Sequence, residues 1–171
     1  MSAVELTDEM SPATSFRNGM RRLVGAVTAI ASRMPDGTPV GLAATAVCSV
    51  SVDPPTLLVC VNTTSSLGRA VAVGQSFSVN VLGADQESLA RAFGGMTGLT
   101  QAQRFELGGW DMESGCVPVL RDAEATFECR VSSAQVSGSH YILLGTVERV
   151  RTAQGEGGAL GYLNGGFVSV R

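Results

Sequence analysis

Hydrophobic residues recur at every second position, or form short runs bounded by Gly, Pro and Asp, over most of the chain. Both patterns are typical of β-strands. They predict strands over 26–34, 40–52, 56–61, 77–82, 123–133 and 140–152, and a last strand over 162–170 with a kink at Gly165-Gly166. Polar turns separate the strands, such as Pro35-Asp36-Gly37, in which proline fixes φ and glycine accepts a positive φ.

Helical spacing is confined to short segments. Ser11-Pro12 supplies a capping hydroxyl and a proline at the first helical position, and Phe16, Met20 and Leu23 then share one apolar helix face. We expect a short helix over 67–73 and a second helix that is capped at Ala84-Asp85 and ends at Phe93. We expect 94–115 to be a long, mostly irregular segment. A loop of that length often forms a lid or a binding segment.

This order of elements predicts a mainly β protein. Strands and helices do not alternate as in a Rossmann sheet, so we expect a closed or nearly closed antiparallel barrel with a few short helices. The length fits one domain, which we place at residues 11–171 after a flexible N-terminal segment, 1–10.

Composition narrows the possible partners. Only 16% of the 171 residues are charged while 44% are hydrophobic, so either a subunit interface covers part of the surface, as in a homodimer, or a large barrel core is surrounded by small residues. A net charge of −3 without a basic stripe argues against nucleic-acid binding. The longest apolar stretch has nine residues, against about 20 for a membrane span. We therefore expect a cytoplasmic protein with no membrane partner.

The metal-binding and nucleophilic residues are few. Cys48, Cys60 and Cys129 lie in apolar β runs and are expected to be buried and inert, and no Cys-x-x-Cys spacing suggests zinc or a disulfide framework. His140 is the only histidine, so a site with several histidine ligands cannot form within one chain. The sequence contains no Gly-x-Ser-x-Gly motif, the turn that carries the nucleophile of many Ser-His-Asp hydrolases, so a hydrolase of that type is not indicated. We expect no metal site.

Two neighbouring segments could form a ligand slot. Small residues dominate 41–46, where a flat ligand could approach the backbone, and Thr45, Ser49 and Ser51 add hydroxyls. The loop 62–66 places four hydroxyls and an amide before a predicted helix, where a phosphate could bind. On the residues alone, an unliganded small-residue strand followed by a capped loop remains the favoured alternative.

The order of these motifs resembles the short-chain flavin reductase family, the reductase components of two-component flavin monooxygenases. The resemblance covers about 16–170 and implies the FMN-binding split-barrel fold. The matching segments are the small-residue strand that ends in Asp-Pro-Pro and continues to Asn-x-x-Ser (41–66), Phe93-Gly94-Gly95, Arg104-Phe105, Phe127-Glu128-Cys129-Arg130 and Gly138-Ser139-His140.

The resemblance implies roles for particular residues. It places the flavin ring and ribityl chain beside the backbone of Ala43, Ala44, Thr45, Ala46 and Val47, and the flavin phosphate near Ser51, Asn62, Ser65 and Ser66. It places His140 at the nicotinamide end of the site and Tyr162 close by. Two positions depart from the family pattern: Ser139 replaces the aspartate before the histidine, and Ala43 and Thr45 replace a frequent Thr/Asn pair.

The function implied is an NAD(P)H:flavin oxidoreductase that transfers a hydride to FMN or FAD and supplies reduced flavin to a separate oxygenase. Two alternatives stay open. The protein could retain its flavin and pass electrons to another acceptor such as a cobalt corrin, or it could bind flavin or haem without turnover. The sequence does not discriminate FMN from FAD, or NADH from NADPH.

Overall fold

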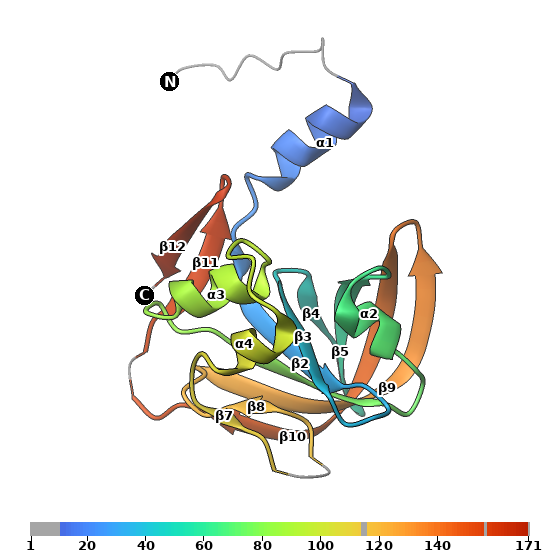
Figure 1. Ribbon diagram of the computed structural model, residues 1–171. Coiled ribbons are helices and arrows are strands. Elements are labelled where there is room, and N and C mark those ends of the chain that lie inside the picture. The colour runs from blue at the N-terminus through green and yellow to red at the C-terminus, as the bar shows by residue number, and fades with distance from the viewer. Residues whose placement is uncertain (1–10, 114–115, 156, 171) are drawn as a thin grey trace.

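One large antiparallel sheet organises the computed structural model, which describes residues 11–113, 116–155 and 157–170 (Figure 1). The expected flexible segment, 1–10, lies outside the described residues. The sheet has the strand order β3-β2-β6-β9-β10-β5-β4. The strands are β2 (Thr28–Arg33), β3 (Pro39–Ala44), β4 (Val47–Val52), β5 (Pro55–Asn62), β6 (Ser76–Val81), β9 (Ala125–Ser137) and β10 (His140–Thr152).

The two edge strands of this sheet are consecutive in the chain. Only Thr45 and Ala46 separate β3 from β4, although five strands lie between them in the sheet. So short a link can join opposite edges only if the sheet curls back on itself, which makes it a barrel split between β3 and β4. The predicted antiparallel split barrel is confirmed. The predicted continuous strand over 40–52 is wrong, because the chain changes its hydrogen-bonding neighbour at Thr45.

Two small sheets complete the β structure. One contains β1 (Gly25–Ala26), β11 (Ala159–Leu163) and β12 (Gly166–Val170), and the other pairs β7 (Trp110–Asp111) with β8 (Val119–Leu120). The predicted kinked strand over 162–170 is instead the β11–β12 hairpin. Asn164 and Gly165 both have positive φ, 52° and 84°, which is the backbone that an Asn-Gly hairpin turn adopts.

Within the described ranges, three of the four helices pack near the barrel: α2 (Ser66–Ala70), α3 (Glu87–Phe93) and α4 (Gln101–Phe105). The predicted cap at Ala84-Asp85 is wrong, because α3 begins after Gln86 without a side-chain cap. The segment 94–115 is also less irregular than expected in its described part. It contains β7 and α4, and α4 is fixed by a capping box between Thr100 and Gln103.

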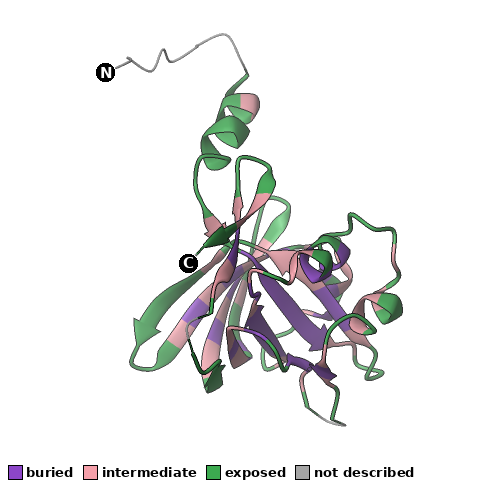
Figure 2. Ribbon diagram, turned by 90° about the vertical axis from the view of Figure 1, so that its left-hand side faces the viewer, coloured by how far each residue is buried: buried purple, intermediate pink, exposed green. Residues whose placement is uncertain are grey.

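Strand β2 lies between two hydrophobic clusters, which explains why its sequence shows no alternation. Ala29 and Ala31 face a cluster with α3, while Ile30 faces the barrel interior with residues such as Val59 and Phe77. In Figure 2 the buried residues, drawn in purple, gather in the strands at the centre of the molecule. The outer cluster contains an aromatic triad, in which ring centroids lie 4.9–5.3 Å apart: Phe93, Phe105 and Trp110.

Helix α1 (Pro12–Met20) starts as predicted, with Ser11 Oγ accepting a hydrogen bond from Thr14 N. It projects away from the barrel (Figures 1 and 2) and has no buried residue. The exposed fractions of Phe16 and Met20 are 67% and 49%, so the predicted apolar face is uncovered in the single chain. No helix in the described part of the chain is both long and apolar enough to span a bilayer.

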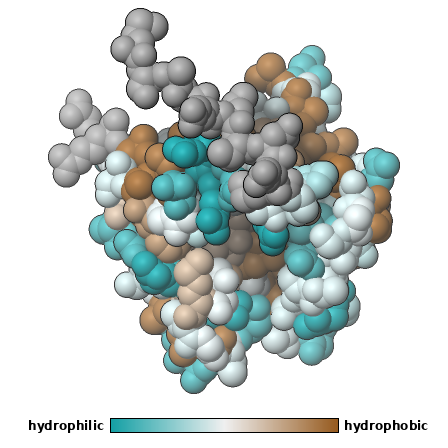
Figure 3. All heavy atoms as spheres, turned by 90° about the horizontal axis from the view of Figure 1, so that it is seen from above, coloured by the Kyte–Doolittle hydropathy of each residue, from teal (hydrophilic) through white to brown (hydrophobic). Residues whose placement is uncertain are grey.

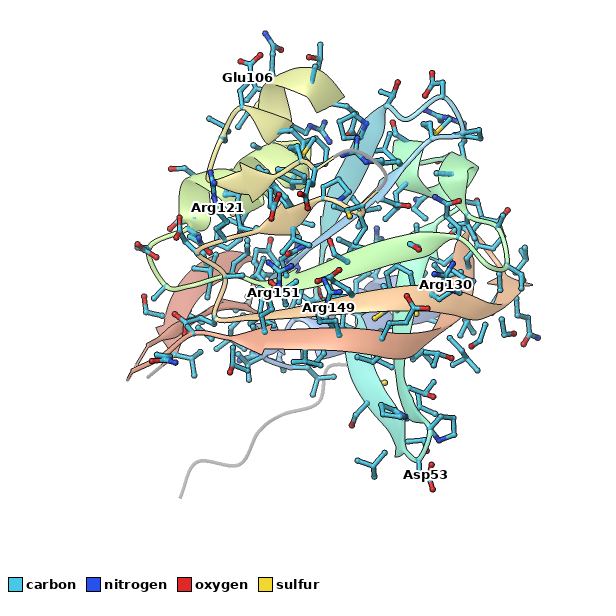
Figure 4. All side chains as sticks on the ribbon, turned by 90° about the horizontal axis from the view of Figure 1, so that it is seen from below. Asp53, Glu106, Arg121, Arg130, Arg149 and Arg151 are labelled. Atoms are coloured by element: carbon cyan, nitrogen blue, oxygen red, sulfur yellow. The ribbon has the colours of Figure 1, made fainter. Side chains whose placement is uncertain are left out.

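Ion pairs occupy the outer face of β9 and β10. Glu128 pairs with Arg149 (3.4 Å) and Arg151 (3.1 Å), and Glu148 pairs with Arg130 (2.6 Å). Figure 4 shows the three arginines on this face and Asp53 at the tip of the projecting β4–β5 hairpin. Each arginine of this face is therefore paired with a glutamate, and the three do not form an uninterrupted cationic stripe.

Candidate functional site

A cavity of about 410 Å³ opens at the end of the barrel where β3 passes into β4. This volume lies within the range of small-molecule sites, roughly 300–1,000 Å³. Figure 3 looks down on this end of the molecule, where apolar surface lies between more polar residues. The cavity brings together several residues that the sequence analysis named: Ala43, Ala44, Thr45, Ala46, Asn62, His140 and Tyr162.

The floor of the cavity is the point at which the barrel splits. The carbonyl of Ala44 accepts a hydrogen bond from Thr28 Oγ1 of β2 (2.8 Å), whereas the carbonyl of Ala46 accepts one from Cys60 N of β5 (3.0 Å). Thr45 lies between these two anchors. The main chain therefore diverges here while its small side chains leave space above it.

The free edge of β3 faces this space. Gly41 bonds the side chain of Gln101 through both its N–H (2.9 Å) and its C=O (3.1 Å). In an antiparallel strand, alternate residues direct their main-chain groups to opposite sides. Ala43 therefore directs its N–H and C=O to the same unpaired edge as Gly41, and Ala43 lines the cavity.

Gly41 has no side chain because α3 packs directly on β3. A Cβ at Gly41 would lie 2.7 Å from the Phe93 ring and 2.9 Å from the Ile30 carbonyl oxygen. This close packing places Ala90 and Gly94 of the α3 region on the cavity wall.

The hydroxyl-rich loop after β5 is held mainly by its own residues. Asn62 Oδ1 accepts hydrogen bonds from Thr64 N (2.9 Å) and Thr64 Oγ1 (2.8 Å). Ser65 Oγ donates to the Asn62 carbonyl (2.7 Å) and accepts from Gly68 N (2.9 Å), so it caps α2. Arg69 donates to the Thr64 carbonyl (2.7 Å) and to Ser66 Oγ (3.3 Å).

Four of the named residues do not line the cavity. Ser65 and Ser66 belong to the internal network of this loop. Val47 packs against the barrel interior. Ser51 lies near the tip of the β4–β5 hairpin, where its Oγ donates to the Asp53 carbonyl (3.0 Å) and accepts from Asp53 N (3.1 Å). Since β4 runs away from the split, residues late in it move away from the cavity.

His140 begins β10 directly opposite Asn62 in the β5–β10 ladder. Its Nδ1 lies 2.9 Å from Ser139 Oγ. The Ser139 carbonyl accepts hydrogen bonds from Thr63 N (3.0 Å) and Thr63 Oγ1 (3.2 Å), which tie the β9–β10 turn to the loop after β5. The histidine thus has a fixed place on the wall.

Tyr162 and Phe167 close the opposite side of the cavity from the β11–β12 hairpin. Their ring centroids are 5.2 Å apart in an edge-to-face arrangement, and the Arg91 guanidinium lies 5.1 Å from the Phe167 ring centroid. Sequence reasoning did not find Phe167. It also missed several other wall residues: Val27, Leu42, Cys60, Ala90, Gly94 and Met96.

The cysteines differ from one another more than predicted. Cys129 is buried as expected, and burial, with the nearby carboxylates of Glu148 and Glu128, raises the pKa of its thiol to about 12. Cys48 is exposed and Cys60 is half-buried on the cavity wall, so the expectation of burial is wrong for both. Both side chains lie on the outer face of the β4–β5 hairpin.

The chemistry available in the cavity is that of shape and main-chain polarity. The lining residues include no carboxylate, lysine or arginine. In the described ranges, no group of three or more His, Cys, Asp or Glu could hold a metal ion. A flat, largely apolar ring with amide-like edges fits small walls, an unpaired strand edge and one imidazole.

Comparisons with known proteins agree with this geometry. The model of the "Flavin reductase like domain" family matches residues 20–171. The FMN reductase (NADH) RutF of Agrobacterium fabrum is 39% identical over 163 residues, 95% of this chain and 91% of the relative. The 4-hydroxyphenylacetate 3-monooxygenase reductase component of Pseudomonas aeruginosa is 37% identical over 90% of this chain and 89% of its own.

Solved structures show the same fold. BorF, the flavin reductase component of a bacterial two-component tryptophan halogenase, has a TM-score of 0.80 at 30% identity and covers 92% of this chain and 98% of its own. The Streptomyces globisporus C-1027 NADH:FAD oxidoreductase SgcE6, solved with NAD and FAD fragments, has a TM-score of 0.80 at 28% identity and covers 96% of both chains. Since the family model and these relatives span most of its length, the chain belongs to the flavin reductase family.

Proposed function

We propose that the protein is an NAD(P)H:flavin oxidoreductase that passes a hydride to FMN or FAD in the cavity at the split of the barrel. The observation that carries this proposal is the unpaired β3 edge at Ala43 in a small-walled, uncharged cavity. The names of the relatives favour NADH with FMN as the first pair to test, and the FAD-using relative keeps FAD open.

The flavin ring is proposed to lie along Ala43, Ala44, Thr45 and Ala46. The side chain of Gln101 is an example of the kind of group that this strand edge binds. Its carboxamide accepts a hydrogen bond from the N–H of Gly41 and donates one to the C=O of Gly41. The flavin pyrimidine ring presents a similar neighbouring N–H and C=O, and Ala43 is the next residue with the same orientation. The small walls would allow this approach on both sides of the ring.

The flavin phosphate is proposed to lie beyond Asn62, toward Ser65 and Ser66. Asn62 lines the cavity, and Arg69 adds a positive charge beside the loop. For Ser51 and Val47 we propose only distant contacts with the flavin. Such contacts would need either an extended flavin tail or a movement of the β4–β5 hairpin. The hydroxyl groups of this loop already form hydrogen bonds within it. We therefore expect the loop main chain and Arg69 to contribute most to binding the phosphate.

In this reaction the protein binds and orients its reactants. The flavin accepts the hydride with its own atoms, and the protein supplies position and electrostatics. His140 is proposed to hold the nicotinamide carboxamide, and Tyr162 with Phe167 to limit access of water from the other side. The absence of carboxylate side chains among the lining residues suits a step that needs no general base from the protein.

The reduced flavin is proposed to pass to a separate oxygenase, a proposal supported by two relatives named as the reductase component of a monooxygenase and as the flavin reductase component of a two-component halogenase. A homodimer is also proposed. A nine-residue helix without buried residues is marginal in water, so α1 gains stability only if its apolar face is covered. A second copy of the chain is the occupant that we propose.

Steady-state kinetics test the proposed function. Tag-free protein should oxidise NADH at a rate that saturates with added FMN or FAD, and it should lose bound flavin on desalting. A yellow protein that keeps its flavin and reduces only another acceptor would favour the retained-flavin alternative. No NADH or NADPH oxidation with either flavin would contradict the proposal and favour a binding protein without turnover.

A further inference from the structure

The imidazole of His140 contacts the residue that precedes it. Ser139 Oγ lies 2.9 Å from Nδ1. The main chain of Ser139 is itself held, because its carbonyl accepts both hydrogen bonds from Thr63. The serine hydroxyl therefore meets the ring from a position that is anchored to the loop beside the cavity.

A hydroxyl and a carboxylate have opposite effects on such a ring. A neutral imidazole has one N–H donor and one acceptor nitrogen, and the partner of one nitrogen selects the state of the other. A hydroxyl can donate to a bare Nδ1, which leaves the proton of the neutral ring on Nε2, or it can accept from Nδ1–H. A carboxylate only accepts, so it holds the proton on Nδ1 and leaves Nε2 of the neutral ring as an acceptor.

We propose that Ser139 is a positioning residue whose hydroxyl donates to Nδ1 of the neutral His140 ring, so that the proton stays on Nε2 and the neutral ring offers the cavity a hydrogen-bond donor. The role of that donor rests on the proposed function, in which the carboxamide oxygen of the nicotinamide accepts from it.

The surroundings of the ring support this assignment. Within the described ranges, Nε2 has no protein partner, so it is available to a ligand. Asn62 is the only other lining side chain with N–H groups. The titratable or charged groups nearby are Cys60 and Tyr162 on the walls, Tyr141 next in β10 and Arg69 beside the loop. None of them is a carboxylate that could hold the proton on Nδ1 instead.

Nuclear magnetic resonance tests the tautomer directly, because the chain has one histidine and its signals need no assignment. Tag-free ¹⁵N-labelled protein would be examined by long-range ¹H–¹⁵N correlation at alkaline pH, where histidine is neutral. We expect a protonated Nε2 and a bare Nδ1 in the wild type and in Ser139→Thr, and the reverse in Ser139→Asp. A wild-type proton on Nδ1, or no change in Ser139→Asp, would overturn the proposal.

Kinetics provide the second readout. Ser139→Asp and Ser139→Ala should raise the KM for NADH about three- to tenfold, the range of one hydrogen bond, with flavin affinity unchanged. Ser139→Thr should restore the wild-type value, and Ser137→Ala, on the other arm of the turn, is the matched control. A wild-type KM in Ser139→Asp would overturn the donor role. Because the magnetic resonance readout needs neither flavin nor NADH, failure of the proposed function would leave the tautomer result standing.

Discussion

At the scale of single residues, the main property of the cavity is that its lining carries small side chains and no permanently charged ones. Its lining residues include no carboxylate and no permanently charged cation, and several are alanine. A fixed charge beside a flat apolar ring would have to be desolvated without a partner, which costs free energy. Main-chain groups at Ala43 and the imidazole of His140 supply polarity without that cost.

His140→Ala removes the imidazole donor from the wall. The KM for the nicotinamide should rise about three- to tenfold, or the hydride-transfer rate should fall to a similar extent, because one hydrogen bond is lost. Flavin affinity should stay within about twofold of the wild type on the same scale. Stopped-flow and steady-state kinetics with calorimetry measure both effects. Unchanged kinetics would remove His140 from the site.

Alkylation of Cys60 should inactivate the protein, because its thiol lies on the cavity wall while Cys129 is buried with a pKa of about 12. Iodoacetamide treatment followed by activity and mass measurements tests this, and excess flavin should protect. Cys60→Ser should resist inactivation, whereas Cys48→Ser should stay as sensitive as the wild type. Equal loss of activity in Cys60→Ser would show that another thiol is responsible.

At the scale of elements, the sequence was informative where local chemistry decides the structure. The turn at 35–37, the cap at Ser11 and the long β9–β10 hairpin follow directly from residue types and periodicity. The break at Thr45 could not be predicted in this way, because a change of strand partner leaves the apolar pattern unaltered. The same limit explains Ser51, whose distance from the cavity depends on where β4 points.

Two further local signals in the sequence mark elements that the hydrophobic pattern alone does not show. Asn164-Gly165 is a strong hairpin signal, and it marks the β11–β12 turn that carries Tyr162 and Phe167 to the cavity. Thr100 and Gln103 have the spacing of a capping box, which marks α4 inside a segment expected to be irregular. By contrast, no local signal shows that the side chain of Gln101 binds the edge of β3.

Gln101→Ala should affect both stability and flavin binding, because two hydrogen bonds hold α4 to the edge of β3. The free energy of unfolding should fall by about 1–3 kcal/mol, and flavin affinity by about three- to tenfold. Urea denaturation and calorimetry measure these changes. Gln103→Ala, in the same helix but away from β3, should cost about 1 kcal/mol or less and leave flavin affinity intact. Equal effects of both variants would contradict a specific role for Gln101.

At the scale of the whole molecule, the barrel buries the apolar side chains of its own strands but leaves those of the N-terminal helix α1 exposed. Two buried clusters lie on either side of β2, and the polar side chains buried in the described part of the chain have partners. Helix α1 stands outside this arrangement with Phe16 and Met20 exposed. The low share of charged residues is consistent with a surface that is partly covered by a second copy.

Phe16→Asp together with Met20→Asp should convert the proposed dimer into monomers, because carboxylates would replace its apolar contacts. Light scattering coupled to size-exclusion chromatography measures the mass. Asn18→Asp adds a charge to the same helix on another side and should leave the dimer intact. A wild-type protein that is monomeric at micromolar concentration, or a double variant that stays dimeric, would contradict the role of α1.

The most direct measurement of the central claim is FMN binding to Ala43→Pro. Proline removes the main-chain N–H of Ala43 but no hydrogen bond of the sheet, because that N–H faces away from β2, and edge strands tolerate proline. The fold should survive while FMN affinity, measured by calorimetry, falls about tenfold or more. Ala43→Gly, which keeps the N–H, should bind FMN much like the wild type. Wild-type affinity in a folded Ala43→Pro protein would show that the flavin is not seated on this strand edge.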